Sequence, residues 1–214
     1  MSSPGGETYR LEAFADAVFA IAITLLIIEI QLPPHDEVVR RGGLAPTLLY
    51  LWPSYLAYLI SFIVIGIMWA NHYNLMKLID RVDHRFITLN LLLLLCIAFL
   101  PFPTAVMAEH LTNHDERSVG VAFYCGCFTV TAALYFLVWW HAAKDRRLIA
   151  AHIPDDAVRA VTRAYAPGFV LYLAATVLAF VHVAISLVIV LGLAIVYILP
   201  GAGAHKAANK ANEA

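Results

Sequence analysis

Residues 10–32 read RLEAFADAVFAIAITLLIIEIQL, and this stretch decides the class of the chain. It is long and apolar enough to cross a bilayer, whose hydrocarbon core of ~30 Å needs about 20 residues of helix. Yet Arg10, Asp16, Thr24 and Glu29 lie within it or at its ends. An ionisable group in hydrocarbon costs about 3 kcal/mol or more, so it normally faces a protein interior or a water-filled path. The stretch therefore predicts either a conduit or a buried polar contact between helices.

The composition of the whole chain indicates an integral membrane protein. Hydrophobic residues make up 62% of the 214 residues, the mean hydropathy is +0.77 and only 14% of the residues are charged. A soluble domain of this size cannot cover so much apolar surface. The net charge of −1 and the lack of a basic stripe argue against nucleic-acid binding. Because the sequence contains no nucleophile–base pair, phosphate-binding loop or carboxylate dyad, we do not expect an enzyme or a resident cofactor.

Six apolar stretches are each long enough to span a bilayer, which predicts an all-α membrane protein with six transmembrane helices. The expected spans are residues 12–32, 47–72, 86–108, 118–141, 164–181 and 183–200. The last two are separated only around His182, and together they are too long for one straight crossing. Pro101 and Pro103 predict a kink or an end in the third helix. We expect one domain over residues 1–200 and a disordered tail over residues 201–214.

The distribution of Lys and Arg predicts the orientation, because cytoplasmic loops carry more of these residues. With six crossings, one side of the membrane holds three of them, Arg40, Arg41 and Arg117. The other side holds Arg10, Lys77, Arg81, Arg85, Lys144, Arg146, Arg147, Arg159, Arg163, Lys206 and Lys210. We therefore expect both termini to be cytoplasmic.

The first helix presents an apolar stripe on one face and an acid on another. At 100° per residue, Ile21, Thr24, Leu25 and Ile28 fall within an arc of about 100°, and Asp16 lies about 140° from Ile21. If the stripe lines a pore, Asp16 lies behind the pore wall and contacts another helix. The alternative is that the stripe belongs to an ordinary helix core.

The residue after this stripe, Glu29, lies near the outer end of the same helix. A ring of such carboxylates at a pore mouth would concentrate cations.

The second helix carries a polar cluster of Trp69, Asn71 and His72 at the depth expected for Asp16. Buried polar groups at that depth must find partners. We expect a network in which His72 and Trp69 hydrogen-bond toward Asp16 or Arg10 and fix the first helix in register. The alternative is an interfacial belt, since Trp and His are common at headgroup level.

These residues also resemble the signature of a known family. The run of Arg10, Phe14, Ala15, Asp16 and Ile21 resembles the R-x-x-x-F-S-D-x-x-x-x-I motif of the endolysosomal potassium channel family, the transmembrane protein 175 family. Trp69 and His72 resemble its W-x-x-H motif, and Asn90 and the Leu100-Pro101-Phe102 run resemble its N and L-P-F positions. The matches cover the first three helices. One departure is Ala15, where the family has serine.

The resemblance implies a non-classical potassium-selective channel, a homotetramer in which the first helix of each chain surrounds the axis. The family's isoleucine constriction maps onto Ile21, with Leu25 and Ile28 continuing a hydrophobic gate, and its selectivity hydroxyl maps onto Thr24. The residues that map onto a structural polar network are Arg10, Phe14, Asp16, Trp69, Asn71, His72 and Asn90. No TVGYG filter is present, so the selectivity does not come from a carbonyl ring.

Six crossings per chain correspond to the prokaryotic form of this family, which implies a multi-pass protein of a prokaryotic plasma membrane. The permeant ion would be K⁺, and the resemblance also allows protons. The expected partners are other copies of the chain and membrane lipids. The run Asn113-His114-Asp115-Glu116 is expected to be a solvated loop and not a metal site.

A secondary transporter or proton relay is the alternative function, with Asp16 and His72 as the carriers. It is weakened because the chain shows no inverted repeat and little charge within the membrane.

Overall fold

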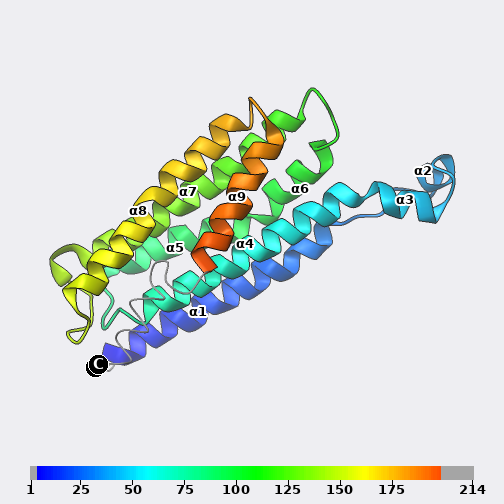
Figure 1. Cartoon of the computed structure of the whole chain (residues 1–214). Coiled ribbons are helices and arrows are strands. Elements are labelled where there is room, and N and C mark those ends of the chain that lie inside the picture. The colour runs from blue at the N-terminus through cyan, green and yellow to red at the C-terminus, as the bar shows by residue number, and fades with distance from the viewer. Residues whose placement is uncertain (1–3, 199–214) are drawn as a thin grey trace.

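The computed structural model describes residues 4–198, with side chains described for residues 6–196. In this range every regular element is a helix, and the helices form an elongated bundle (Figure 1). The long helices, in chain order, are α1 (Pro4–Leu25), α4 (Trp52–Met76), α5 (His84–Phe99), α6 (Pro101–His110), α7 (Arg117–Ala143), α8 (Asp155–Leu178) and α9 (Val183–Ile198). Shorter segments are the 3-10 helices η1 (Leu26–Glu29) and η2 (Lys144–Arg146) and the α-helices α2 (His35–Arg40) and α3 (Leu44–Tyr50). The predicted tail over residues 201–214 lies outside the described residues.

Five spans of the described chain are long and apolar enough to cross a membrane: residues 6–29, 52–76, 84–110, 117–146 and 155–178. The sixth predicted span corresponds to α9, which is apolar but shorter. Helices α8 and α9 are separate, as the sequence predicted around His182, and residues 179–182 join them.

Several helix ends differ from the predicted bounds. The first helix begins at Pro4 and not at residue 12, and it ends at Glu29, because Pro33 and Pro34 force an extended backbone before them. The fifth span begins at Asp155 and not at residue 164, since acids in a first turn stabilise a helix start. The apolar residues of a helix identify only the part that fits the hydrocarbon core. The first and fifth predicted spans therefore began later than their helices, whose first turns are polar.

The third span is broken where the prolines predict it. Helix α5 ends at Phe99 and α6 starts at Pro101. The Thr104 hydroxyl lies next to the break, 2.8 Å from the Leu100 carbonyl oxygen and 2.8 Å from the Ser61 hydroxyl. Ser61 also bonds to the Tyr124 hydroxyl at 2.9 Å, so a buried hydroxyl cluster joins α4, α6 and α7.

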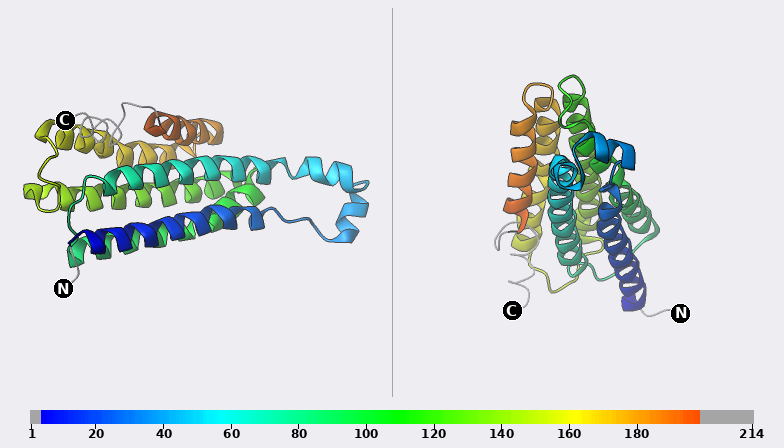
Figure 2. Two further views of the ribbon diagram at one scale, coloured as in Figure 1. Left: turned by 90° about the horizontal axis from the view of Figure 1, so that it is seen from below. Right: turned by 90° about the vertical axis from the view of Figure 1, so that its right-hand side faces the viewer.

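Helix α1 lies at the edge of the bundle and packs on α4 and α5 through one face. Its buried residues are Leu11, Ala15, Phe19, Ala22 and Leu26, spaced three or four apart as one helix face requires. Helices α8 and α9 lie on the opposite side of the bundle from α1 (Figure 2). The opposite face of α1 is exposed among the residues that the structure describes.

At the end of the bundle where α4 meets α5, two loops pair with each other. The Asp80 amide donates to the Leu148 carbonyl and the Ala150 amide donates to the Leu78 carbonyl, both at 3.0 Å. Asp83 caps α5 by accepting a hydrogen bond of 2.7 Å from the Phe86 amide. Its carboxylate also lies 2.9 Å from His141 Nε2 at the end of α7. This carboxylate therefore ties α5 to α7.

Asp83 gives a pH-dependent prediction. Burial acts to raise the pKa of Asp83, but hydrogen bonds from the Phe86 amide and His141, with the charges of His141 and Arg147, outweigh it and hold the pKa below its ordinary 3.8. Its stabilisation is therefore present above pH 3.8 and is lost as the pH falls through the lowered pKa. At neutral pH, Asp83→Ala should lower the unfolding free energy by about 1 kcal/mol.

Thermal unfolding of the detergent-solubilised protein measures this effect, with Asp80→Ala, an exposed acid of the same loop, as the control. The difference between wild type and Asp83→Ala should shrink in strong acid. A difference that grows in acid would contradict the assignment.

Candidate pore-lining face of the first helix

The predicted stripe of α1 is exposed on the surface of the single chain. The exposed fractions of Ile21, Leu25 and Ile28 are 58%, 39% and 60%. Thr24 is exposed between them, and Ala17 and Ala20 continue the same face toward the N-terminus. The alternative that these residues form the core of their own chain is therefore wrong. They make a continuous face, uncharged from Ala17 to Ile28, that needs another partner.

Thr24 presents a hydroxyl oxygen on this face. Its Oγ1 lies 3.0 Å from the Ala20 carbonyl oxygen and 2.9 Å from the Ile21 carbonyl oxygen, and it donates its hydrogen to one of them. A hydroxyl held in this way keeps its lone pairs free to accept a hydrogen bond or to contact a cation. Glu29 follows at the end of η1, where it is partly buried.

Asp16 points to a different neighbour, as the helical wheel predicted. Its Oδ1 accepts a hydrogen bond of 2.8 Å from Trp69 Nε1 on α4. The predicted contact between Trp69 and Asp16 is therefore present. This bond connects α1 to α4 and restricts the rotation of α1 against α4.

His72 makes a different bond from the one predicted. Its Nε2 lies 3.0 Å from Asn90 Oδ1 on α5, and Asn90 Nδ2 donates to the Phe86 carbonyl at 3.0 Å. Since the Asn90 amide nitrogen is used in this way, its oxygen accepts and His72 donates from Nε2. The predicted bond of His72 to Asp16 or Arg10 is replaced by this one. The His72 Nδ1 has no hydrogen-bond partner among the described residues, and the ring packs against Phe19 with centroids 5.6 Å apart.

The pair of His72 and Asn90 should be costly to break. Both side chains are buried, so Asn90→Leu leaves the His72 Nε2–H without its acceptor. An unsatisfied buried donor costs about 1–3 kcal/mol, and we expect the unfolding free energy to fall by that amount. Thermal unfolding measures it, and Thr88→Val at an exposed position of the same helix is the control. An Asn90→Leu protein as stable as wild type would show that the pair does not fix α4 against α5.

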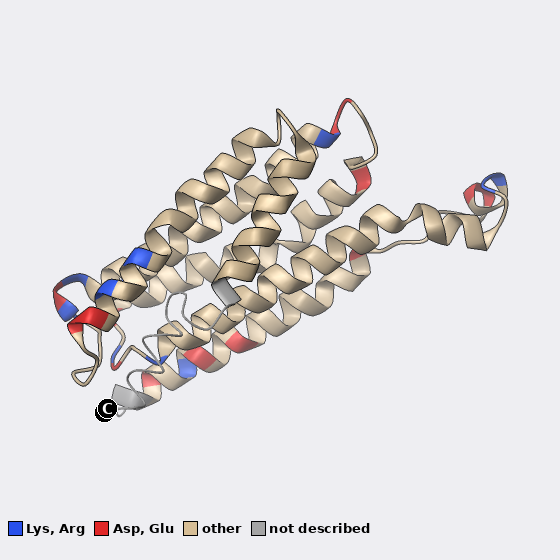
Figure 3. Cartoon of the chain, viewed as in Figure 1, with Lys and Arg blue, Asp and Glu red and all other residues tan. Residues whose placement is uncertain are grey.

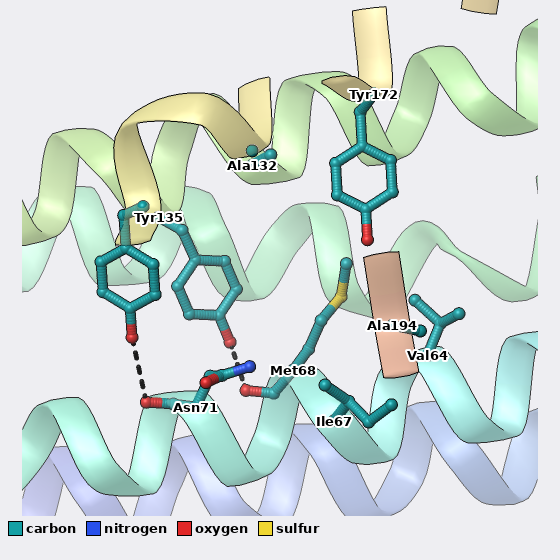
Figure 4. A pocket seen from close by; sticks show the side chains of 10 residues that line it. Val64, Ile67, Met68, Asn71, Ala132, Tyr135, Tyr172 and Ala194 are labelled. Atoms are coloured by element: carbon teal, nitrogen blue, oxygen red, sulfur yellow. Dashed lines mark hydrogen bonds between the residues drawn. The ribbon is translucent and has the colours of Figure 1, made fainter. Parts of the chain in front are cut away.

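Three further residues assigned to the network by the sequence lie elsewhere. Arg10 and Phe14 are on the exposed face of α1, and no hydrogen bond of Arg10 is found in the part of the chain that the structure describes. Asn71 lines a pocket of about 50 Å³ between α4, α7, α8 and α9 (Figure 4). Beside it, the Tyr135 hydroxyl donates to the Met68 carbonyl oxygen at 2.6 Å. Asn71 lies two residues after Trp69, about 200° around α4, so it faces α8 while Trp69 faces Asp16.

Comparison with known proteins gives consistent likenesses. Residues 10–101 match the family model described as the endosomal/lysosomal potassium channel TMEM175. The chain is 46% identical over 193 residues to a potassium channel of Chamaesiphon minutus, covering 90% of this chain and 94% of that protein. It is 41% identical over 181 residues to a potassium channel of Streptomyces collinus, covering 85% and 86% respectively.

A solved structure agrees with the sequence comparison. The crystal structure of a lysosomal potassium-selective channel TMEM175 homolog from Chamaesiphon minutus matches with a TM-score of 0.83 and 44% identity. The match covers 92% of this chain and 98% of that one. High identity over nearly the full length of these relatives, together with the shared fold, shows that the chain belongs to the TMEM175 family, a family of ion channels and not of enzymes.

Proposed function

We propose that this protein is a potassium channel that assembles as a homotetramer in a prokaryotic plasma membrane, with α1 of each copy around a central pore. The observation that carries the proposal is the uncharged apolar face of α1, which stays exposed when the chain is folded. One helix per chain cannot enclose a pore, so several copies must supply it. The relatives described as potassium channels support the choice of ion.

The gate in this proposal is a hydrophobic constriction. Rings of Ile21, Leu25 and Ile28 from several copies exclude water from the axis, and a dry segment blocks ions. A modest dilation or rotation of α1 admits water, and K⁺ passes with it. Thr24 hydroxyls between these rings supply oxygen atoms to a passing cation. Glu29 beyond the last ring raises the local concentration of cations at the outer mouth.

In the proposed channel, two hydrogen-bonded pairs of side chains position α1. The Trp69–Asp16 bond links α1 to α4, and the His72–Asn90 bond links α4 to α5. The His72–Asn90 bond is buried, and the Trp69–Asp16 bond lies at a partly exposed flank of α1, on a different face from the stripe. They therefore hold α1 at the rotation that turns Ile21 to the axis.

The distribution of charges supports an orientation in which both termini are cytoplasmic. Among the described residues, Lys77, Arg81, Arg85, Lys144, Arg146, Arg147 and other basic residues gather toward the end of the bundle that holds the start of α1 (Figure 3). The opposite end has Arg40, Arg41 and Arg117. We assign the first end to the cytoplasm, since cytoplasmic loops carry the excess of Lys and Arg.

The carrier alternative has less support. A proton relay through Asp16 and His72 needs a path between them, and their hydrogen bonds lead to different partners, Trp69 and Asn90. A channel also explains why the apolar face of α1 is exposed, because that face would line the pore.

Reconstitution tests the proposed function. Purified protein in a planar bilayer with K⁺ on both sides should give unitary current steps that do not need a proton gradient. A K⁺ flux without unitary steps that stops when the proton gradient is removed would show a carrier and would overturn the proposal.

A further inference from the structure

Between α1 and α4 the chain leaves the bundle and forms a separate projection over residues 30–51, which we name the outer hairpin. It consists of an extended segment, helix α2, a turn at Gly42 and Gly43, and helix α3. Both glycines have positive φ values, 86° and 110°, which side chains rarely adopt. The outer hairpin extends past the end of the bundle in two views (Figures 1 and 2).

The outer hairpin is held together by its own contacts. Arg41 forms an ion pair with Glu37, and its guanidinium lies 3.6 Å from the centre of the Tyr50 ring. The Thr47 hydroxyl donates to the Gly43 carbonyl at 2.8 Å. The contact between Arg41 and Tyr50 joins the end of α2 to α3, and the other two bonds lie within single helical turns.

A hollow separates the outer hairpin from the body of its own chain. This cavity of about 580 Å³ has Pro33, Glu37 and Tyr50 on the hairpin side and Ala108 and Thr112 of the α6 end on the other. The outer hairpin therefore does not bury its apolar side chains against α6.

Large apolar side chains of the outer hairpin remain exposed: Leu32, Val39, Leu44, Leu48, Leu49 and Tyr50. All of them lie outside the spans that are long and apolar enough to cross the membrane. Apolar surface in water is unfavourable by about 25 cal/mol per Å², and a group of such side chains normally marks an interaction surface. A group of exposed apolar side chains outside those spans is the kind of surface that a protein partner covers.

A second copy of the chain is the partner that the geometry favours. The outer hairpin follows η1 directly in the chain, and the exposed face of α1 also needs copies of the same chain in the proposed assembly. Helix α2 has two acids, Asp36 and Glu37, in its first turn and the base Arg40 in its last turn. Among the described residues, the Arg40 Nε donates to the Asp36 backbone oxygen at 3.3 Å and not to the Asp36 carboxylate, which can therefore meet another copy. Opposite charges at the two ends of α2 suit a head-to-tail contact that repeats around a ring.

We propose that the outer hairpin docks on the neighbouring copy and closes a ring at the outer mouth of the pore. The apolar side chains of α3 cover the neighbour, and Asp36 of one copy meets Arg40 of the next. The inference rests on the proposed function, because it needs copies arranged around α1. It adds an assembly surface outside the membrane to the surface within it.

The test compares two substitutions at equally exposed positions. Leu49 in α3 and Val181 in the turn between α8 and α9 are each 77% exposed in the single chain. Leu49→Glu should therefore leave the fold of one chain unchanged, and so should Val181→Glu. If Leu49 is covered by a neighbour, Leu49→Glu should raise the concentration at which the assembly half-dissociates by roughly tenfold, since a buried interface residue carries binding energy. Val181→Glu should leave it as in wild type.

Light scattering of the full-length protein in mild detergent, over a dilution series, measures the assembly, and circular dichroism checks the helix content of each variant. A charge reversal at Arg40, Arg40→Asp, is the second variant and should weaken the assembly in the same direction. An assembled wild type with Leu49→Glu and Arg40→Asp proteins that dissociate no more readily than Val181→Glu would overturn the inference and leave the proposed function standing. A monomeric wild type would overturn the proposed function, and the inference with it.

Discussion

Ile21→Asn should turn a closed pore into a leaking one. In the proposed assembly, Ile21 forms a dry ring, and an amide at each ring position supplies hydrogen bonds that keep water in the constriction. Each 1.4 kcal/mol removed from the barrier raises the flux tenfold, and we expect an increase of about tenfold or more in resting K⁺ efflux. Liposomes loaded with K⁺ and containing a fixed amount of assembled protein measure this efflux directly.

The matched control is Ile195→Asn, because Ile195 is an exposed isoleucine of α9 on the opposite side of the bundle. This substitution introduces the same amide into an apolar helix without touching the proposed axis, and its efflux should equal that of wild type. Loss of transport in Ile21→Asn, with correct assembly, is what a carrier would show and would contradict the gate.

Asp16→Ala should impair folding or assembly more than conduction. The substitution removes the acceptor of the 2.8 Å bond from Trp69. A hydrogen bond typically contributes about 0.5–1.5 kcal/mol, so the unfolding free energy should fall by that amount and the tetramer fraction should fall with it. Thermal unfolding and light scattering measure both quantities, and single-channel recording measures the conductance of the channels that still assemble.

A double-mutant cycle isolates this contact. Trp69→Phe keeps a large ring and removes the N–H donor, and the Asp16→Ala/Trp69→Phe protein should lose less stability than the two single losses added together. Assembled Asp16→Ala tetramers with normal stability and a changed ion preference would place the carboxylate in the permeation path, and they would contradict the position behind the pore wall that we propose for it.

The spans could be predicted from the sequence because hydrocarbon depth selects for apolar runs. The break at Pro101 followed from proline chemistry, and the separation of α8 from α9 followed from the length of the apolar stretch. The outer hairpin could not be predicted in this way. Leu48, Leu49 and Tyr50 continue the apolar run of the second helix, so the predicted span over residues 47–72 included part of α3, which lies outside the membrane spans.

The candidate site was predicted in part. Depth and helical spacing placed Trp69 near Asp16, and the structure has that bond. Depth and helical spacing do not determine which neighbouring helix His72 faces. His72 bonds to Asn90 on a third helix, α5. The hydroxyl cluster of Ser61, Thr104 and Tyr124 was not predicted, since single hydroxyls in apolar helices form no pattern that the sequence alone reveals.

Imaging of single particles of the purified protein in a lipid nanodisc tests the central claim most directly, because the account depends on the exposed face of α1 being shared by several copies. The account predicts a particle with four-fold symmetry in which α1 is the innermost helix and Ile21, Leu25 and Ile28 face the axis. A monomeric particle, or an assembly in which α1 lies at the perimeter against lipid, would contradict it.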